Sequence, residues 1–343
     1  MIKAAIIDGA GYNAGELLRL LVNHPDVTVV RVQSDRYAGK AVTEIHHGLE
    51  GDTDLRFCAD IDYNGIDILF CCLPNGESSR LFTARPFPGQ LRVVDLGADF
   101  RLTPDPQAAN AVAVAPGDEP THAPAPGQWV YGLPELNRKP MVRGARQVAN
   151  PGAFAMIIEL ALLPLARNLL LNGPIHITAI TGSTADGPEP SMLTHFPRLN
   201  DNVEIYDPLT HRHLAEIMQT IRSIQASFSS EIDFIPVRAG FSRGILATIY
   251  LDCPVDIETL EKLYDGSYSD HNFTFRIGRR PDLKDVAGTN KCLIHLEKIG
   301  KKLLVTAAID NLLKGGAGTA VHNMNLLFGL HERTGLYLHP TAF

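Results

Sequence analysis

The chain has 343 residues, of which 45% are hydrophobic and 20% are charged, a balance that is typical of globular proteins and excludes extensive disorder. Its length predicts about two domains. The formal charge of -7, from 31 basic and 38 acidic residues without long runs of one sign, argues against nucleic-acid or anionic-membrane partners and favours a small-molecule ligand. No apolar stretch approaches the roughly 20 residues that span a bilayer, so we expect a cytoplasmic protein.

The first 150 residues alternate short apolar runs with a helical pattern, which indicates βαβ units on a parallel sheet. A helix is expected near Ala14–Asn23. The expected strands are Lys3–Ile7, Val27–Val32, Ile66–Cys72 and Leu91–Asp95.

A glycine-rich turn, Gly9-Ala10-Gly11-Tyr12-Asn13-Ala14, follows the first strand and opens the first helix. Backbone N–H groups and the helix dipole can bind a pyrophosphate there, and a tight turn without a ligand is the alternative. The second strand ends at Gln33-Ser34-Asp35-Arg36. Ser34 and Arg36 favour the 2′-phosphate of NADP, whereas Asp35 favours a free ribose 2′-hydroxyl, and Arg36 can equally be a solvated charge.

The second half of the chain has a different pattern. The proline-rich stretch at residues 103–128 predicts a surface loop, and the apolar segment Ala153–Leu171 predicts a helix at the domain junction. The helical spacing of Gly318–Leu330 lets this end pack back on the first domain. Between these two helices, β-rich runs dominate, which predicts an α+β domain with a mixed or antiparallel sheet. The expected strands are Ile175–Thr181, Asp233–Val237, Ile245–Asp252, Phe273–Ile277, Leu293–Glu297 and Leu303–Ile309. Five scattered cysteines without a C-x-x-C pair favour buried, reduced thiols and predict no metal site.

Eight segments spread along nearly the whole chain carry family motifs: Gly9–Leu18, Cys72–Pro74, Val94–Arg101, Tyr131–Arg138, Val148–Gly152, His211–Ile217, Phe241–Ile245 and Asp310–Gly315. Together they resemble the N-acetyl-γ-glutamyl-phosphate reductases of arginine biosynthesis. The resemblance implies an NADP-binding Rossmann-like domain at residues 1–150, completed by a C-terminal helix in about 311–343. It implies a glyceraldehyde-3-phosphate-dehydrogenase-like α+β domain at 151–310, for substrate binding and oligomerisation, and a homo-oligomer, dimer or tetramer. The reaction implied is reduction of an N-acyl-glutamyl phosphate to the semialdehyde with loss of phosphate.

The resemblance also implies the site residues. In that family a cysteine follows Asn-Pro-Gly at the start of a helix, where the helix end and a nearby histidine favour a thiolate. The thiolate displaces phosphate and forms a thioester, which hydride from NADPH reduces. The histidine corresponds to His213. Substrate binding is implied for Asn150, Ser183, Arg243 and Lys314, and cofactor binding for Gly9, Gly11, Tyr12, Asn13, Ala14, Ser34, Arg36, Pro74 and Asn311. For Arg243 and Lys314, solvated salt bridges are the alternative.

The chain departs from the family at the nucleophile, because Ala153 occupies the position of the cysteine. Other positions that face phosphate or substrate in the family also differ, which favours natural divergence over a single engineered change; they are Asp8, Asn75, Met156, Ala185, Asp186 and Thr319. Two functions follow: an NADP-dependent reductase that is impaired at Ala153, or a catalytically inactive paralogue that acts as a partner or regulatory subunit. Direct hydride transfer to a free aldehyde or ketone ranks last, and the acyl group is left open.

Overall fold

The structure, a computed structural model, describes residues 1–103 and 129–341. The loop predicted for residues 103–128 lies, apart from Thr103, outside them. The described chain divides into two compact units. The first unit comprises residues 1–103, 129–151 and 316–337, and the second comprises 152–315 and 338–341. No helix within the described ranges is long and apolar enough to cross a bilayer.

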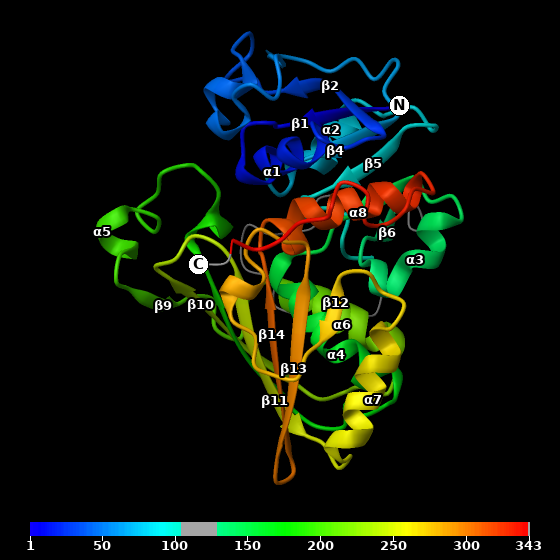
Figure 1. The fold of residues 1–343 in the computed structure, drawn as a ribbon, viewed down its shortest axis with the longest axis vertical. Helices are drawn as coiled ribbons and strands as arrows, with labels where there is room; N and C mark the ends of the chain where they lie inside the picture. Colours follow the sequence, from blue (N-terminus) through cyan, green and yellow to red (C-terminus); the bar gives the residue numbers. More distant parts are fainter. Residues whose placement is uncertain (104–128, 342–343) are drawn as a thin grey trace. The chain divides into compact units, whose positions relative to one another are not determined.

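The first unit is built on a parallel sheet with the strand order β3-β2-β1-β4-β5-β7-β6 (Figure 1). Its central strands are nearly continuously buried, as expected of a parallel sheet that is covered on both faces. The strands are β1 (Ile2–Ile7), β2 (Val27–Gln33), β3 (Phe57–Cys58), β4 (Ile68–Cys71), β5 (Arg92–Asp95), β6 (Trp129–Tyr131) and β7 (Gln147–Ala149).

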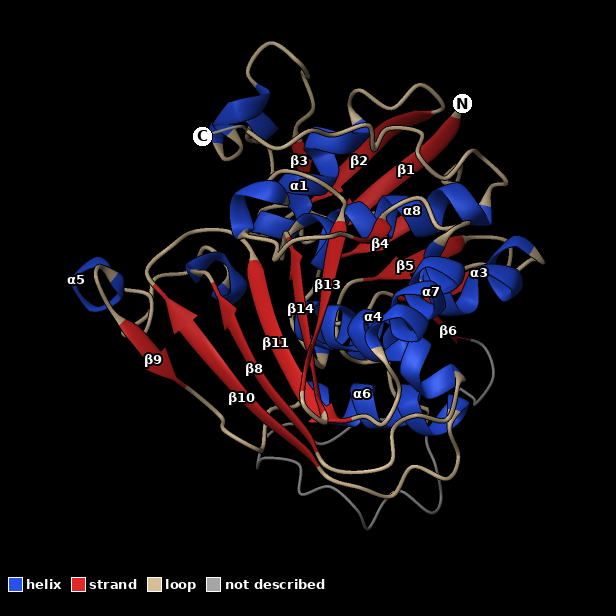
Figure 2. Cartoon of the chain, turned by 60° about the horizontal axis from the view of Figure 1, so that its bottom comes forward, coloured by secondary structure: helices blue, strands red, loops and turns tan. Residues whose placement is uncertain are grey.

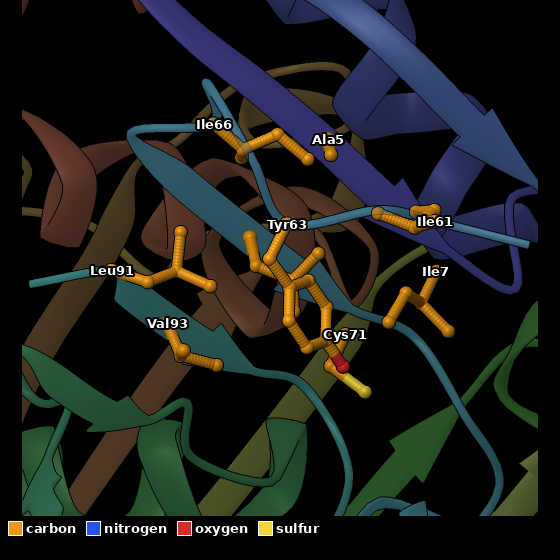
Figure 3. Close-up of a cluster of buried hydrophobic side chains, with 9 residues drawn as sticks. Ala5, Ile7, Ile61, Tyr63, Ile66, Cys71, Leu91 and Val93 are labelled. Atoms are coloured by element: carbon orange, nitrogen blue, oxygen red, sulfur yellow. The ribbon is translucent and has the colours of Figure 1, made fainter. Parts of the chain in front are cut away.

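A cluster of buried apolar side chains packs against β1, β4 and β5 (Figure 3). Ile7 and Cys71 contribute from the ends of β1 and β4, and Tyr63 covers them from the segment before β4. Burial raises the pKa of the Cys71 thiol well above its usual value. This cluster therefore fixes the carboxyl ends of the strands, where the following loops begin.

Helices α1 (Tyr12–Leu21), α2 (Glu77–Ala84) and α3 (Pro134–Val142) belong to the first unit, and α8 (Gly318–Leu327) completes it. Every residue of α8 is buried, and the helix contacts α1, α3 and β5. Polar side chains of α8 form hydrogen bonds within the first unit: His24 Nε2 lies 3.1 Å from Asn325 Oδ1, and His322 Nε2 lies 2.7 Å from Glu332 Oε2. The helical spacing near the end of the sequence thus forms a helix of the first unit.

The second unit contains a mixed sheet with the order β12-β13-β14-β11-β8-β10-β9. The pairs β8–β10 and β12–β13 are parallel and the other pairs are antiparallel, which confirms the predicted mixed sheet. The strands are β8 (Ile175–Thr181), β9 (Val203–Ile205), β10 (Ile232–Ala239), β11 (Ile245–Asp252), β12 (Thr274–Arg276), β13 (Cys292–Ile299) and β14 (Lys302–Ile309).

Helices α4 (Ala153–Arg167), α6 (His213–Ile224) and α7 (Ile257–Tyr268) lie on one side of this sheet (Figure 2). Residues 154–166 of α4 are all buried, and the helix contacts β11, β13 and β14. It ends four residues before the predicted end, where Leu169 adopts a φ of 57°. Along β8, Ile175, Ile177 and Ala179 are buried, whereas the alternate residues are partly exposed. We call the side that these alternate residues occupy the open face of the sheet.

Candidate active site

The N-terminus of α4 carries Ala153, the position that the sequence analysis predicts for the nucleophile. Ala153 is the first residue of the helix and is half-buried, and Gly152 precedes it in an extended conformation without a side-chain cap. The positive end of the helix dipole is therefore directed at this position. A Cβ added to Gly315 would lie 2.7 Å from the Ala153 Cβ, so the glycine permits the chain to pass closely there.

His213 and Glu216 lie on the first turn of α6 and are both buried. Glu216 Oε2 accepts a hydrogen bond of 3.0 Å from the Gly152 N–H, and Glu216 Oε1 lies 3.8 Å from His213 Nε2. One carboxylate therefore links the histidine to the start of α4. Sequence reasoning did not single out Glu216, although its spacing of three residues from His213 places both on one helix face.

Aromatic contacts join the same two helices. The ring centroid of Phe154 lies 6.2 Å from that of His213 and 5.4 Å from that of His211. His211 Nδ1 accepts a hydrogen bond of 3.1 Å from the His213 N–H. Burial, followed by the charge of Arg212, lowers the pKa of His211 to about 4. His211 is therefore neutral near pH 7, and its ring holds the backbone of His213.

Arg243 and Lys314, the predicted substrate cations, differ in exposure. Arg243 donates from Nε to Asp310 Oδ2 at 3.0 Å and from Nη2 to Asp310 Oδ1 at 3.3 Å, with a quarter of its side chain exposed. Asp310 is fully buried and also accepts from three backbone N–H groups, which hold it in place. Lys314 is fully buried. The guanidinium is thus preorganised, and Asp310 offsets part of its charge.

Asn311, predicted as a cofactor residue, braces the second unit. Its Oδ1 accepts from the Gly244 N–H at 2.7 Å, and its Nδ2 donates to Thr184 Oγ1 at 3.0 Å. Thr184 follows Ser183, a predicted substrate residue that is partly exposed at the start of a short 3-10 helix, Ser183–Asp186. These bonds tie that turn to the strand ends that carry Arg243 and Asp310.

Asp186, which the sequence analysis interprets as a departure from the family pattern, has a partner within the second unit. It pairs with the buried Arg238 at 2.9 Å, and Arg238 also pairs with Glu204 at 2.7 Å. The guanidinium lies 4.7 Å from the centroid of the Tyr206 ring. The negative charge at position 186 is therefore balanced within the second unit.

The glycine-rich turn of the first unit is tightly packed at Gly9 and open at Gly11. A Cβ on Gly9 would lie 2.2 Å from Val32 Cγ1, so that only glycine fits, whereas a Cβ on Gly11 would meet nothing within 4 Å. Asn13 Oδ1 is buried without a hydrogen-bond partner in the described structure, which leaves an acceptor for a ribose hydroxyl. Ala14 is buried in α1 and Tyr12 is exposed. These residues fit an NAD-type cofactor.

Asp8 begins this turn with a φ of 55°, in the left-handed region where glycine is favoured. Its N–H donates to Gln33 Oε1 at 3.1 Å. Desolvation, followed by the charge of Asp8, raises the pKa of the Cys72 thiol well above its usual value. The Asp8 carboxylate therefore acts electrostatically at the carboxyl ends of β1 and β4.

The other predicted cofactor residues of the first unit lie at strand ends. Ser34 is buried, and the Arg36 guanidinium is 5.2 Å from the centroid of the Tyr37 ring. Pro74 lies on the turn between β4 and α2. Asp99 caps that helix by accepting from the Gly76 and Ser79 N–H groups at 2.6 and 2.8 Å, a role that its place in the Val94–Arg101 segment did not reveal.

Asn150, predicted to bind substrate, has both amide atoms engaged within the first unit. Its Nδ2 donates to the Gly316 oxygen at 3.2 Å, and its Oδ1 accepts from Asn323 Nδ2 at 3.1 Å. The side chain is buried. These hydrogen bonds join the end of β7 to the segment that contains α8.

Comparisons with known proteins define the class. Residues 3–143 match the family model of the semialdehyde dehydrogenase NAD binding domain, and residues 154–311 match that of the dimerisation domain. Aspartate semialdehyde dehydrogenase II from Vibrio cholerae, in complex with ASA, has a TM-score of 0.69 and 17% identity over 96% of this chain and 98% of its own. Aspartate semialdehyde dehydrogenase from Candida albicans, solved with NADP, has a TM-score of 0.66 and 12% identity over 96% and 98%. These structures show the shared fold, and the chain is built as a semialdehyde dehydrogenase, a class of oxidoreductase.

Relatives of higher identity narrow the class. The N-acetyl-gamma-glutamyl-phosphate reductases of Parabacteroides distasonis and Phocaeicola vulgatus are 49% and 47% identical to the chain, each over 100% of both sequences. The chain therefore belongs to the N-acetyl-gamma-glutamyl-phosphate reductase family. The predicted fold class, a Rossmann-like domain with an α+β second domain, is confirmed.

Proposed function

We propose that the chain binds NADP(H) in its first unit and an N-acyl-γ-glutamyl phosphate of arginine biosynthesis in its second unit. We further propose that it reduces this acyl phosphate to the semialdehyde only at a strongly impaired rate. The observation that carries this proposal is the presence of Ala153 at the helix end that His213 and Glu216 flank. A cytoplasmic location, as predicted from the sequence, belongs to the same proposal.

The surroundings of position 153 support a thiolate site that lacks its thiol. The positive end of α4 would lower the pKa of a thiol there, and a protonated His213 would add to this effect. His213 is also the group that can return a proton at the reacting centre. A methyl group has no lone pair and cannot displace phosphate, so the covalent step is lost in this chain.

The phosphate end of the substrate is proposed to meet Arg243. Its guanidinium is fixed by Asp310 while a quarter of the side chain stays exposed, which suits a donor that binds an anion without reorganising. Ser183, on the partly exposed turn that Asn311 braces, is proposed to add a hydroxyl donor.

The cofactor is proposed to bind the turn that Gly9, Gly11 and Asn13 form, with its 2′-phosphate at Ser34 and Arg36. Bound NADPH would supply the hydride. The open space at Gly11 and the buried acceptor of Asn13 support this binding mode, whereas the charge of Asp8 opposes it.

A second candidate function is that of a catalytically inactive partner of an active homologue. The open face supports it, because the uncharged side chains of Thr178, Ile180 and Thr248 lie there on β8 and β11 and are partly exposed. The match to a dimerisation domain supports a homo-oligomer in either case. A mixed oligomer with an active relative, detected by co-purification of two differently tagged chains, would favour this candidate.

Phosphate-dependent reduction of NADP with N-acetylglutamate semialdehyde tests the main proposal. The unmodified chain is expected to be slower than its relatives by up to about 10⁶-fold, the cost of deleting a nucleophile in a well-studied protease. Ala153→Cys is expected to restore part of the activity, and Ala153→Ser, the matched control of similar size, is expected to restore far less.

Two further measurements sharpen the test. The first is the alkylation rate of Ala153→Cys as a function of pH, after subtraction of the rate for the unmodified chain, whose own cysteines also react. The remaining rate should rise with pH around a value that lies below the pKa of an ordinary thiol. Reverting Asp8, Met156, Ala185 and Asp186 together with Ala153 is expected to exceed the single reversion. Rapid turnover by the unmodified chain would contradict the proposal.

A further inference from the structure

The Gln33 side chain connects two parts of the first unit that face the proposed cofactor. Gln33 is the last residue of β2 and is half-buried. Its Oε1 accepts from the Asp8 N–H at 3.1 Å, and its Nε2 donates to Asp35 Oδ1 at 2.7 Å and to the Ala59 oxygen at 3.3 Å. One amide therefore ties the end of β2 to the glycine-rich turn.

The partner of this amide, Asp35, has the charge that is wrong for NADP. An acidic side chain at the end of the second strand binds the ribose 2′-hydroxyl of NAD and repels the 2′-phosphate of NADP. Ser34 and Arg36, on either side of Asp35, have the opposite preference. Which of these side chains can reach the ribose therefore decides whether NAD or NADP binds more tightly.

We propose that Gln33 is a specificity-determining residue, which holds the Asp35 carboxylate against the end of β2 and so favours NADP(H) over NAD(H). The bond from Nε2 to Asp35 is short and has a charged acceptor, the stronger kind of hydrogen bond. This inference rests on the proposed cofactor site and names the residue that sets its selectivity.

The neighbouring cation, Arg36, packs on an aromatic ring. Its guanidinium lies over the Tyr37 ring, with 5.2 Å to the centroid, and this contact restricts its conformations. Removing the Gln33 amide is therefore expected to release Asp35 toward the ribose and to leave the contact of Arg36 with Tyr37 in place. Affinity for NADPH should fall and affinity for NADH should rise.

The test is a double-mutant cycle on the full chain, in which calorimetry measures the ratio of the NADH and NADPH dissociation constants. Gln33→Leu is expected to reduce the preference for NADPH about tenfold, the effect of one hydrogen bond to a charged group. Asp35→Asn alone should change the ratio less than about threefold, because the carboxylate is already held, and Gln33→Leu should then have no further effect in this background.

The measurements distinguish a failure of the inference from a failure of the proposed cofactor site. If Gln33→Leu leaves the ratio unchanged, or weakens both nucleotides equally through the lost bond to the Asp8 N–H, the inference is wrong. The inference is also wrong if Gln33→Leu still changes the ratio in the Asp35→Asn background, or if Asp35→Asn alone raises the preference for NADPH tenfold or more. If the unmodified chain binds neither nucleotide, the proposed cofactor site fails, and the inference fails with it.

Discussion

Ala153 and Gly315 approach so closely that a side chain fits at only one of the two positions. A Cβ at position 315 would lie 2.7 Å from the Ala153 Cβ and 3.3 Å from its Cα, and both atoms are fixed by the backbone. The Gly315 N–H donates to the backbone carbonyl oxygen of Asp310 at 2.9 Å, which closes the turn. The start of α4 and the turn after β14 are therefore fitted to each other.

We expect Gly315→Ala to reduce the free energy of unfolding by about 1 to 3 kcal/mol, because overpacking forces the backbone to shift. Denaturant titration measures this change. Gly266→Ala is the matched control: it lies in α7 with nothing within 4 Å of its added Cβ and should be neutral or stabilising by up to about 1 kcal/mol. Ala153→Gly should relieve part of the cost of Gly315→Ala, and strict additivity would argue against the close contact.

Asp8→Gly is expected to tighten nucleotide binding, because a carboxylate about 4 Å from a phosphate would cost up to about 4 kcal/mol at an effective dielectric of about 20. Calorimetry with NADPH measures the change. Asp8→Asn separates charge from conformation, because asparagine tolerates the left-handed backbone and removes only the charge. Equal affinity for NADPH in the unmodified chain and both variants would show that Asp8 has no effect on binding.

The lowered pKa of His211 predicts a loss of stability in acid. In the unfolded chain this ring takes up a proton near pH 6.5, whereas in the folded protein its pKa is about 4. The unfolded state therefore binds the proton first, and up to about 3 kcal/mol of stability is lost as the pH falls through this window. Above about pH 6.5 the contribution is fully present.

His211→Asn isolates this contribution, because its side-chain oxygen can accept from the His213 N–H in place of Nδ1. Between about pH 7 and about pH 4.5, the free energy of unfolding of the parent should fall by about 2 to 3 kcal/mol more than that of the variant. Parallel pH dependence of the two chains in urea titrations would show that His211 does not titrate as argued.

The open face of the second unit predicts where copies of the chain associate. Thr178 and Thr248 lie opposite each other on β8 and β11, and Ile180 pairs with Leu246 beside them. An arginine at position 178 would bury an unpaired charge in such an interface, so Thr178→Arg should convert the oligomer to a monomer in light scattering. Glu258→Arg, an exposed change on α7, should leave the assembly intact. A monomeric unmodified chain would refute this interface.

Local patterns in the sequence were enough to predict the order and type of most elements. Strands β8 and β11 have the bounds that their apolar runs predict, and β1, β2 and β4 differ by one or two residues. The reason is that burial on one or both faces of a sheet leaves a periodic trace in neighbouring residues. The family motifs likewise led us to predict, without any coordinates, that Ala153 occupies the position of the nucleophile.

The tertiary structure decided which side chains that are distant in the sequence form hydrogen bonds with each other. Glu216 reaches Gly152 across 64 residues, Asn311 braces Thr184 across 127, and Gln33 joins Asp8 to Asp35. Asn150, which stays a predicted substrate residue, accepts a hydrogen bond from Asn323 of α8 across 173 residues. Hydrogen bonds depend on distance and direction in space, and a single sequence records neither for residues that are far apart along the chain.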